Sequence, residues 1–371
     1  MIIFYSLIIF SLAVYSFSLI DPNITFLQTR WWEVFRENLV YFGYYRRDLS
    51  WLIYLSLVLL LFIFHYYFIK KYKQFSPHKL AFIIGGILVV SYPFLSHDFF
   101  NYMFDARILT FYHQNPYLST ALDFPSDLWT RFMHWTHRTY PYGPVFLLIT
   151  LVPSFLSLGK FVLSFLLFKF TFVLFYLLSV YLLHKIDRKN AVIFATHPLI
   201  IIEGLVNSHN DLIAVSLGIA GLFYLLKNNS LAARLLFLAS AGIKFITFPI
   251  LFLLNKKNFW NRLVITVTIF VIFYLSLSFE IQPWYFLNLF IFLALFKSLE
   301  FKQNLNVGKF DLFFAGLLLS YYPYIRLGGW DTNEKVEFKH SIIIFFTFLN
   351  LLYFFFLHKE VIFKRIGIKT K

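Results

Sequence analysis

Repeated runs of about 20 apolar residues constrain this chain more than any other feature. A bilayer core of about 30 Å is crossed by about 20 apolar helical residues, and only helices or closed barrels satisfy their backbone polar groups there. The chain is 60% hydrophobic and 14% charged, against about a quarter charged in soluble domains, which excludes a water-soluble globule. We therefore expect an all-α polytopic membrane protein. The predicted spans are residues 1–20, 51–70, 80–95, 161–183, 191–206, 212–227, 262–279, 284–299, 310–327 and 341–358.

Positive charges gather on one side of these runs. Lys and Arg accumulate in the cytoplasmic loops of membrane proteins, and with the N-terminus inside, the predicted inner segments hold 20 basic residues. The predicted outer loops hold 9 basic and 11 acidic residues. The net charge of +15 therefore comes mostly from the Lys and Arg residues of the cytoplasmic loops. This distribution predicts a multi-pass protein of the plasma (inner) membrane with both termini cytoplasmic. No basic soluble domain remains to bind nucleic acid.

Two apolar stretches do not fit a simple crossing. Residues 142–158 contain two prolines, and a crossing there would invert the charge rule, so we expect an interfacial segment in the outer leaflet. Residues 231–254 begin and end inside by the same rule, which favours a re-entrant pair that bends near Lys244 and Pro249. Non-helical backbone at this depth is tolerated only inside protein or beside a cavity. The bend therefore indicates a site, and the expected number of transmembrane helices is ten to twelve.

The longest outer loop, residues 96–141, begins with a polar and aromatic motif. Asp98 falls where the third run reaches the outer surface. Tyr102 and Asp105 follow it at helical spacing, as in an amphipathic helix that lies on the bilayer. A solvated loop with routine polar residues is the alternative. The Pro- and Gly-rich residues 140–144 predict a turn that ends a surface helix.

A second polar cluster, residues 207–211, follows the fifth run. It is either a short wet hairpin or the wall of an outward-facing cavity. Glu203 lies within the run itself, where a carboxylate costs several kcal/mol unless it is paired or faces water. Lys169 is a candidate counter-ion for Glu203, which leaves Lys244 without an obvious partner.

A third motif, at residues 282–285, stands at another outer boundary. Trp and Tyr beside a proline are common interfacial anchors, and a functional role requires that they face the same cavity as the other motifs. Topology places all these polar groups on one side of the membrane, at outer-leaflet depth. We therefore predict one pocket that contains Asp98, Asp105, Arg107, His209, Asp211, Lys244 and Gln282.

Taken in order, these motifs resemble the GT-C superfamily of membrane glycosyltransferases, in particular the bacterial polyprenol-phosphate-mannose-dependent mannosyltransferases. The similarity covers residues 80–300. It implies transfer of a hexose, mannose in this family, from a polyprenyl-phosphate donor to a lipid or glycan acceptor on the extracytoplasmic face, with inversion. The matching segments are residues 96–102 with Asp105 and Arg107, 115–117, 140–144, 197–200 with 207–211, Lys244, and 282–285.

The resemblance maps the catalytic acid onto Asp98, with Asp105 as the second candidate. It implies an N-terminal transmembrane hairpin over residues 1–79, a GT-C-like catalytic module over residues 80–300, and a C-terminal hairpin with a basic tail over residues 301–371. Several family members carry two adjacent acids where this chain has one. Metal use therefore stays open: no cofactor is required and no metal ligand is assigned, with a divalent cation as the alternative.

The chemistry of such a transfer suits the same residues. The acceptor hydroxyl loses its proton as it attacks the anomeric carbon, and a carboxylate base within about 3 Å accelerates that step by about 10²- to 10⁴-fold. The leaving phosphate favours a cation in a dry site. Donor phosphate binding is assigned to Arg107, Lys244, His209 and Asp211. Substrate contacts are assigned to Tyr102, Tyr140, Tyr142, Asn207, Gln282, Trp284 and Tyr285.

The main alternative is a polytopic transporter or lipid flippase, which also uses intramembrane charges and broken helices. The chain shows no internal repeat, and its costly polar groups gather at one face rather than at the midplane, which favours the enzyme. The expected partners are the lipid-linked donor, the acceptor and membrane lipids. The absence of cysteine excludes disulfides, thiolate metal sites and cysteine nucleophiles.

Overall fold

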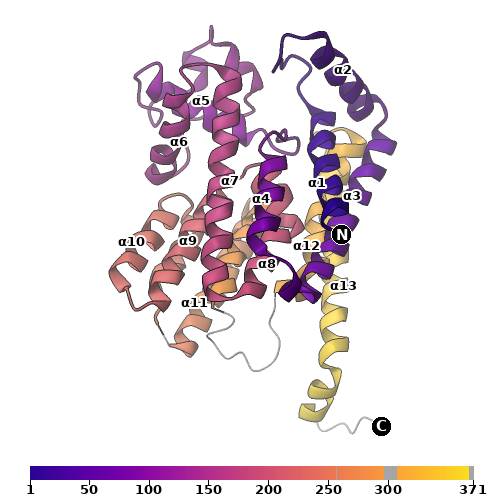
Figure 1. Cartoon of the computed structure of the whole chain (residues 1–371), viewed down its shortest axis with the longest axis vertical. Helices are drawn as coiled ribbons and strands as arrows, with labels where there is room; N and C mark the ends of the chain where they lie inside the picture. The colour runs from indigo at the N-terminus through magenta and orange to yellow at the C-terminus, as the bar shows by residue number, and fades with distance from the viewer. Residues whose placement is uncertain (256, 296–306, 367–371) are drawn as a thin grey trace.

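The computed structural model describes residues 1–255, 257–295 and 307–366, and within them it contains helices and loops without a strand (Figure 1). The predicted all-α class is confirmed. The last residues of the predicted run 284–299 lie outside the described residues. The elements in chain order are α1 (Ile2–Tyr15), η1 (Ser16–Leu19), α2 (Arg30–Tyr45), α3 (Arg47–Lys70), η2 (Tyr72–Gln74), α4 (Pro77–Leu88), α5 (Asp98–Thr110), η3 (Ala121–Asp123), η4 (Leu128–Phe132), α6 (Pro144–Leu156), α7 (Phe161–Ile186), α8 (Arg188–Thr196), η5 (Ile200–Val206), α9 (Asp211–Leu226), α10 (Ser230–Ala241), η6 (Phe245–Phe252), α11 (Asn258–Ser278), η7 (Pro283–Ala294), η8 (Val307–Phe310), α12 (Asp311–Leu319), η9 (Pro323–Leu327) and α13 (Asn333–Ile366).

Five helical segments of the described chain are long and apolar enough to cross a bilayer. A sixth is present if α8 and η5, bent by 65° at their junction, are counted as one span. The predicted count of ten to twelve is not confirmed, because the other apolar runs form helices of 9 to 16 residues, shorter than the about 20 residues of a perpendicular crossing. The five candidate spans are Ile2–Leu19, Arg47–Lys70, Phe161–Ile186, Asn258–Ser278 and Asn333–Leu357.

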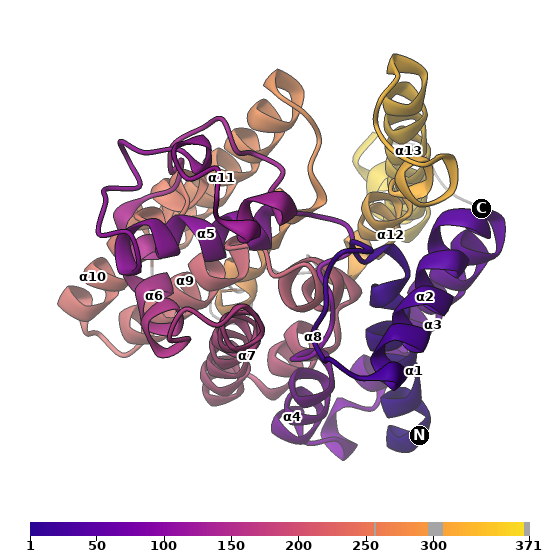
Figure 2. The same cartoon turned by 90° about the horizontal axis from the view of Figure 1, so that it is seen from above.

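α7 stands between the two groups of helices in Figure 1 and lies at one edge of the molecule when it is seen from above (Figure 2). α4, α8 and α9 pack directly against α7. Seen from above, α1, α2 and α3 stand on one side with α12 and α13 beside them, and α9, α10 and α11 stand on the other (Figure 2). α5 and α6, with the loops around them, cover one end of this bundle (Figure 1). One continuous hydrophobic core joins these groups.

Prolines account for two of the interrupted runs. Pro198 follows α8 and has no amide hydrogen to continue a helical ladder, so the chain bends there and resumes as the π-helical turn η5. In the predicted run 310–327, α12 ends at Leu319 and a second π-helical turn, η9, begins at Pro323. Each interruption divides a run that hydropathy predicts as a single span.

The helix after Asp98 forms as the spacing predicts, but its surroundings differ. Ten of the thirteen residues of α5 are buried, so the prediction of an amphipathic helix lying on the bilayer is wrong for this segment. The reason is tertiary packing: the following loop folds back over α5, and Phe104 and Ile108 form a small apolar cluster with Phe124. A buried helix can hold its polar residues in fixed positions.

The stretch at residues 231–254 turns back on itself. α10 ends at Ala241, and the 3-10 segment η6 begins at Phe245 and packs against α10. The turn between them contains Lys244, where the sequence predicts the bend, whereas Pro249 lies inside η6. α6, in the stretch predicted to be interfacial, is 13 residues long.

Candidate active site

Polar and aromatic side chains line a cavity of about 500 Å³ beside the start of α5. Four parts of the chain form its walls: the outer loop, the bend after α10, residues 280–285, and residues 321–339. Segments that are more than 200 residues apart in sequence therefore meet around one hollow. Its charged lining residues are Asp98, Arg138, Lys244, Glu280 and Lys339.

Asp98 lies at the wall of this cavity as the first residue of α5. The Ser96 hydroxyl accepts a hydrogen bond from the Asp98 amide at 3.2 Å and fixes the entry into the helix. A carboxylate at this position is favoured by the partial positive charge of a helix N-terminus. The side chain is 16% exposed, so it is reachable from the cavity while its orientation is held by the protein.

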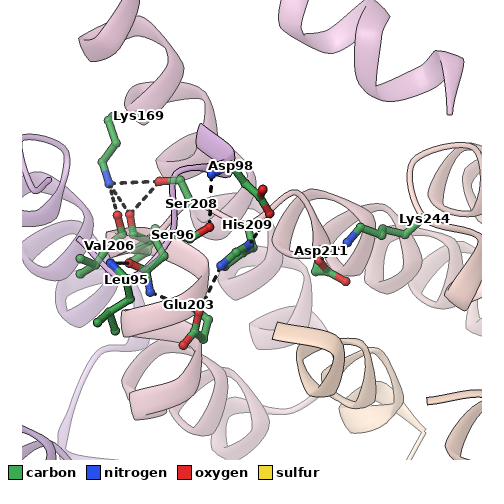
Figure 3. Close-up of polar contacts among 12 residues, drawn as sticks. Leu95, Ser96, Asp98, Lys169, Glu203, Val206, Ser208, His209, Asp211 and Lys244 are labelled. Atoms are coloured by element: carbon green, nitrogen blue, oxygen red, sulfur yellow. Dashed lines mark hydrogen bonds and ion pairs between the residues drawn. The ribbon is translucent and has the colours of Figure 1, made fainter. Parts of the chain in front are cut away.

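Two basic side chains flank the Asp98 carboxylate. His209 Nδ1 lies 3.8 Å from Asp98 Oδ2, and Arg138 Nη2 lies 4.0 Å from Asp98 Oδ1. On the other side of the imidazole, His209 Nε2 lies 3.3 Å from Glu203 Oε2. Asp98, His209 and Glu203 thus form a line that leads from the cavity into the protein interior (Figure 3).

The inner end of this line is fully buried. Glu203 is 0% exposed, and the Asn207 side-chain amide donates a hydrogen bond to its Oε2 at 3.2 Å. The His209 ring stacks on the Trp284 indole at a centroid distance of 4.0 Å and an interplanar angle of 16°. Stacking and the buried carboxylate together fix the plane of the imidazole.

Lys169 does not pair with Glu203, so that expectation from the sequence is wrong. Its ammonium group donates hydrogen bonds to the carbonyls of Leu205 and Val206 and to the Ser208 hydroxyl. These carbonyls lie at the end of η5, where backbone acceptors lack helical partners. Ser208 has a φ of +57°, a conformation that is costly for a non-glycine residue. Lys169 therefore stabilises the turn that presents His209.

The second charged pair at the cavity joins Lys244 to Asp211. Lys244 Nζ lies 2.8 Å from Asp211 Oδ2, and the carboxylate side chain is 0% exposed whereas the lysine side chain is 18% exposed. Asn288 donates a hydrogen bond to the other oxygen of Asp211 at 2.8 Å. The rings of Tyr142 and Tyr285 lie within 6 Å of the ammonium group, a distance at which cation–π attraction operates. Asp211 is thus the partner of Lys244 that the sequence does not reveal.

A close backbone contact sets the spacing between Tyr142 and Lys244. The Val145 amide donates a hydrogen bond to the Gly242 carbonyl at 3.3 Å. A Cβ atom on Gly143 would lie 1.9 Å from that same carbonyl oxygen, closer than any side chain allows. The turn before α6 and the bend after α10 therefore touch because both positions carry glycine.

The structure brings most of the predicted site residues to this region. His209 and Asp211 lie directly behind the wall, in contact with Asp98 and Lys244 respectively, and Asn207 supports Glu203. Tyr102 and Tyr140 are buried behind Tyr142, each with its ring against that of Tyr142. The predicted residues that line the cavity are Asp98, Tyr142, Lys244, Gln282, Trp284 and Tyr285.

Arg107 lies outside the cavity, contrary to the prediction of a shared pocket. Its Nε donates a hydrogen bond to Asp127 Oδ2 at 2.7 Å, and its guanidinium carbon lies 3.9 Å from the centroid of the Phe111 ring and 4.3 Å from that of Trp129. Asp127 lies 20 residues after Arg107, in a loop that folds back over α5. Hydropathy does not predict this fold. We therefore assign Arg107 a structural role.

Asp105 also lies outside the cavity lining and is 6% exposed. Burial raises the pKa of its carboxyl to about 8, although the charge of Arg138 acts in the opposite direction. At neutral pH the group is therefore mostly protonated and is a poor acceptor for a further proton. Of the two predicted catalytic acids, Asp98 is therefore the one that lines the cavity.

Arg138, Glu280 and the cavity residues between 321 and 339 are not among the residues that the sequence predicts for the site. Lys339, near the start of α13, is 5% exposed, and its Nζ lies 3.1 Å from Glu280 Oε1. Burial opposes ionisation of Glu280, but Lys339 and His340 outweigh it and hold the pKa of this carboxyl below its ordinary value. A lysine near the start of an apolar run is the one sequence signal that points to this wall. The aromatic members of the same wall are Tyr321, Tyr324 and Trp330.

Comparison with known proteins agrees with the arrangement of these motifs. A family model described as alpha-(1->6)-mannopyranosyltransferase, N-terminal domain, matches residues 2–256, more than half of the chain. No curated protein and no solved structure matches it. The apolar helices and this match identify a membrane enzyme that transfers sugars. The chain belongs to the alpha-(1->6)-mannopyranosyltransferase family and is a mannosyltransferase of the GT-C type.

Proposed function

We propose that this enzyme transfers mannose from a polyprenyl-phosphate donor to a hydroxyl of a lipid or glycan acceptor, on the extracytoplasmic face of the membrane and with inversion at the anomeric carbon. The observation that carries the proposal is the convergence of Asp98 and Lys244 on one cavity. A carboxylate and an ammonium group are the two charges that such a displacement uses, one for the nucleophile and one for the leaving group.

Asp98 is the proposed general base. It accepts the proton of the acceptor hydroxyl while the oxygen attacks the anomeric carbon and the bond to the phosphate oxygen breaks. His209 and Arg138 lie about 4 Å from its two oxygens, so they orient the carboxylate without a short hydrogen bond that would occupy its lone pairs. Glu203 in turn orients His209 and is a positioning residue.

Lys244 is the proposed contact for the leaving phosphate. Its side chain reaches the cavity, and the buried Asp211 fixes its position from behind. A preorganised cation stabilises negative charge that develops on the leaving oxygen, and it does so most strongly where water is scarce. Arg138, the other basic group beside Asp98, takes the place in this scheme that the sequence assigns to Arg107.

Aromatic residues supply the remaining walls for the sugar units. Trp284 and Tyr285 come from the proposed catalytic module at residues 80–300, and Trp330 comes from the C-terminal segment at residues 301–371. Flat aromatic faces pack well against the C–H faces of pyranose rings, and their polar edges tolerate water. The walls of the cavity therefore include residues beyond the matched family domain.

Asp98→Asn tests the catalytic role. Because the substitution keeps the shape of the side chain and removes the base, transfer from polyprenyl-phosphate mannose by the purified protein in detergent should fall by about 10²- to 10⁴-fold. Donor binding and thermal stability should remain near wild type. Full activity of this variant would remove Asp98 as the base and with it the proposed mechanism.

Single cysteines test the proposed side of the membrane, because the chain has none of its own. Thr120→Cys and Lys335→Cys should react in intact cells with a membrane-impermeant maleimide, and Gln74→Cys should react only after the cells are opened. All three positions are exposed or partly exposed in the structure. The opposite labelling pattern would place the cavity on the cytoplasmic face.

A further inference from the structure

A group of potential metal-binding side chains lies away from the cavity. His65 belongs to α3, His197 stands at the bend between α8 and η5, and Asp311 is the first residue of α12. None of them lines the cavity. Arg47, at the other end of α3, donates a hydrogen bond to the Ile325 carbonyl beside the cavity. At 1.5 Å per residue, His65 is about 27 Å from that end of the helix.

Three ligand atoms converge in this group. One ligand atom from each of the three side chains lies within 4.8 Å of the other two, and His197 Nε2 lies 3.5 Å from Asp311 Oδ1. Among the residues that the structure describes, His65 Nε2, His197 Nε2 and Asp311 Oδ1 have no hydrogen-bond partner. Both histidines are 0% exposed. Buried polar atoms without partners are rare and costly, so their convergence needs an explanation.

The remaining atoms of His65 fix its tautomer. Thr196 donates its hydroxyl proton to the Val192 carbonyl at 2.8 Å, so at 2.8 Å from His65 Nδ1 it acts as the acceptor. His65 therefore carries its proton on Nδ1 and presents a lone pair at Nε2. A histidine whose second nitrogen donates to a protein oxygen is the usual arrangement of a metal ligand.

His197 is held differently. Its Nδ1 accepts a hydrogen bond from the Leu199 amide at 3.1 Å, which places the proton of the neutral ring on Nε2. Coordination through Nε2 requires this proton to move to Nδ1 and the bond from Leu199 to open. The ring exchanges one long hydrogen bond for a metal–nitrogen bond.

An apolar shell surrounds the group. The rings of Phe290 and Phe314 lie 4.6 and 4.9 Å from that of His197, and Phe62 lies on a further side at 6.1 Å. Such a shell limits access of water and strengthens electrostatic interactions inside it. Asp311 retains 27% side-chain exposure, which leaves one side open for a fourth ligand.

We propose that His65, His197 and Asp311 bind one divalent transition-metal ion of the Zn²⁺ class. Imidazole nitrogens favour Zn²⁺ and its neighbours over Mg²⁺ and Ca²⁺, which prefer oxygen ligands. Two histidines and a carboxylate with one open position form a common coordination set for zinc. The ion joins α3, the α8–η5 bend and α12, and it neutralises the carboxylate at this buried junction. This site is separate from the cavity and independent of the proposed transfer mechanism.

Metal content and spectroscopy test the proposal without reference to transfer activity. Wild-type protein purified without a metal-affinity tag, stripped with chelator and re-equilibrated with Zn²⁺ should retain about one ion per chain. His65→Gln and Asp311→Asn should each lower retention at least about 10-fold, as expected when a ligand is lost. Co²⁺ in place of Zn²⁺ should give visible absorption bands of a four-coordinate site in wild type and not in His65→Gln.

His184→Gln is the matched control. His184 belongs to another close histidine pair, with Nδ1 2.7 Å from His78 Nε2, and its loss should leave Zn²⁺ retention and the Co²⁺ spectrum unchanged. Zn²⁺ should raise the melting temperature of wild type and of His184→Gln but not of Asp311→Asn, whereas Mg²⁺ should have no effect.

Two results would overturn the proposal. Wild-type protein that retains no more Zn²⁺ than the His65→Gln variant shows that the group binds no metal. Equal loss of metal from His184→Gln shows that the ion does not belong specifically to the group of His65, His197 and Asp311. In either case a single water molecule, which accepts from His197 and donates to His65 and Asp311, is the occupant that the hydrogen-bond pattern then favours.

Discussion

Two pairs of basic and acidic side chains near the same end of the molecule have opposite surroundings. Arg107 and Asp127 are enclosed, with side-chain exposures of 10% and 3%, and aromatic rings cover the guanidinium group. Lys244 and Asp211 form an equally close pair, but the lysine reaches a cavity. Arg107 also borders a hollow, but a smaller one of about 140 Å³ that none of the other predicted site residues lines. We infer that a costly charge contributes to the proposed transfer where it faces the shared cavity. Elsewhere the same chemistry holds loops together.

Within this comparison, the largest expected effect concerns Lys244 and Asp211, the pair at the cavity. Lys244→Met removes the cation at the cavity and should reduce transfer by about 10²- to 10³-fold, the size seen when one preorganised charge-stabilising group is lost. Because it leaves Asp211 buried without its counter-charge, the double variant Lys244→Met with Asp211→Asn is the control for folding. The double variant should recover thermal stability but not transfer. Recovery of transfer as well would reduce Lys244 to a structural counter-ion.

Substitution in the pair of Arg107 and Asp127 should lower the stability of the fold rather than the transfer activity. Arg107→Met leaves the Asp127 carboxylate without its main partner, and a loss of about 3 to 5 kcal/mol is expected for such a break. Transfer per folded molecule should stay near wild type. Adding Asp127→Asn should restore part of the melting temperature. A selective rise in the KM for the donor, without loss of stability, would show that Arg107 binds substrate. The two pairs would then not differ in the way that we infer.

Substitution of Glu203 tests whether this buried residue acts on Asp98 through His209. Glu203→Gln keeps the side-chain shape but removes the negative charge beside His209, so the orientation of Asp98 should loosen. We expect kcat to fall about 10-fold with an unchanged KM, and the pH profile of kcat to shift. A residue that merely fills space would lower the amount of folded protein and leave the pH profile in place.

The smallest effect is a pH dependence of stability at Asp105. Its pKa of about 8 in the folded protein lies above the ordinary value of an aspartate in an unfolded chain, so the folded state holds the proton more tightly. The resulting stability is fully present below about pH 4 and is lost as the pH rises through about 8. Melting temperatures should show this decline for wild type, whereas Asp105→Asn should lack it. Parallel curves would mean that the carboxyl is ionised in the folded protein.

Local patterns in the sequence were sufficient for the long spans and for the order of the polar motifs. Hydropathy identifies α3 and α7 because about 20 consecutive apolar residues are the length of a helix that crosses a bilayer. The site acids Asp98 and Asp211 are recognisable because each stands where an irregular polar segment meets a helix. In both cases the signal lies within a few residues of the feature that it predicts.

Tertiary contacts account for what the sequence did not reveal. The pairing of Arg107 with Asp127, and of Lys169 with backbone carbonyls rather than Glu203, depends on how distant segments fold together. The burial of α5 depends on the path of the loop after it. Hydropathy also does not separate a long span from two short helices joined at a proline, which is why the predicted number of spans exceeds the five observed candidates.

The contact between Gly143 and Gly242 limits how the enzyme can open. With no room for a side chain between them, Tyr142 and Lys244 are held at a fixed spacing. We infer that a bulky substrate gains space at another wall of the cavity, such as the one that carries Trp330 and Lys339. Substitutions in that wall offer a route to new acceptors that leaves the residues around Asp98 untouched.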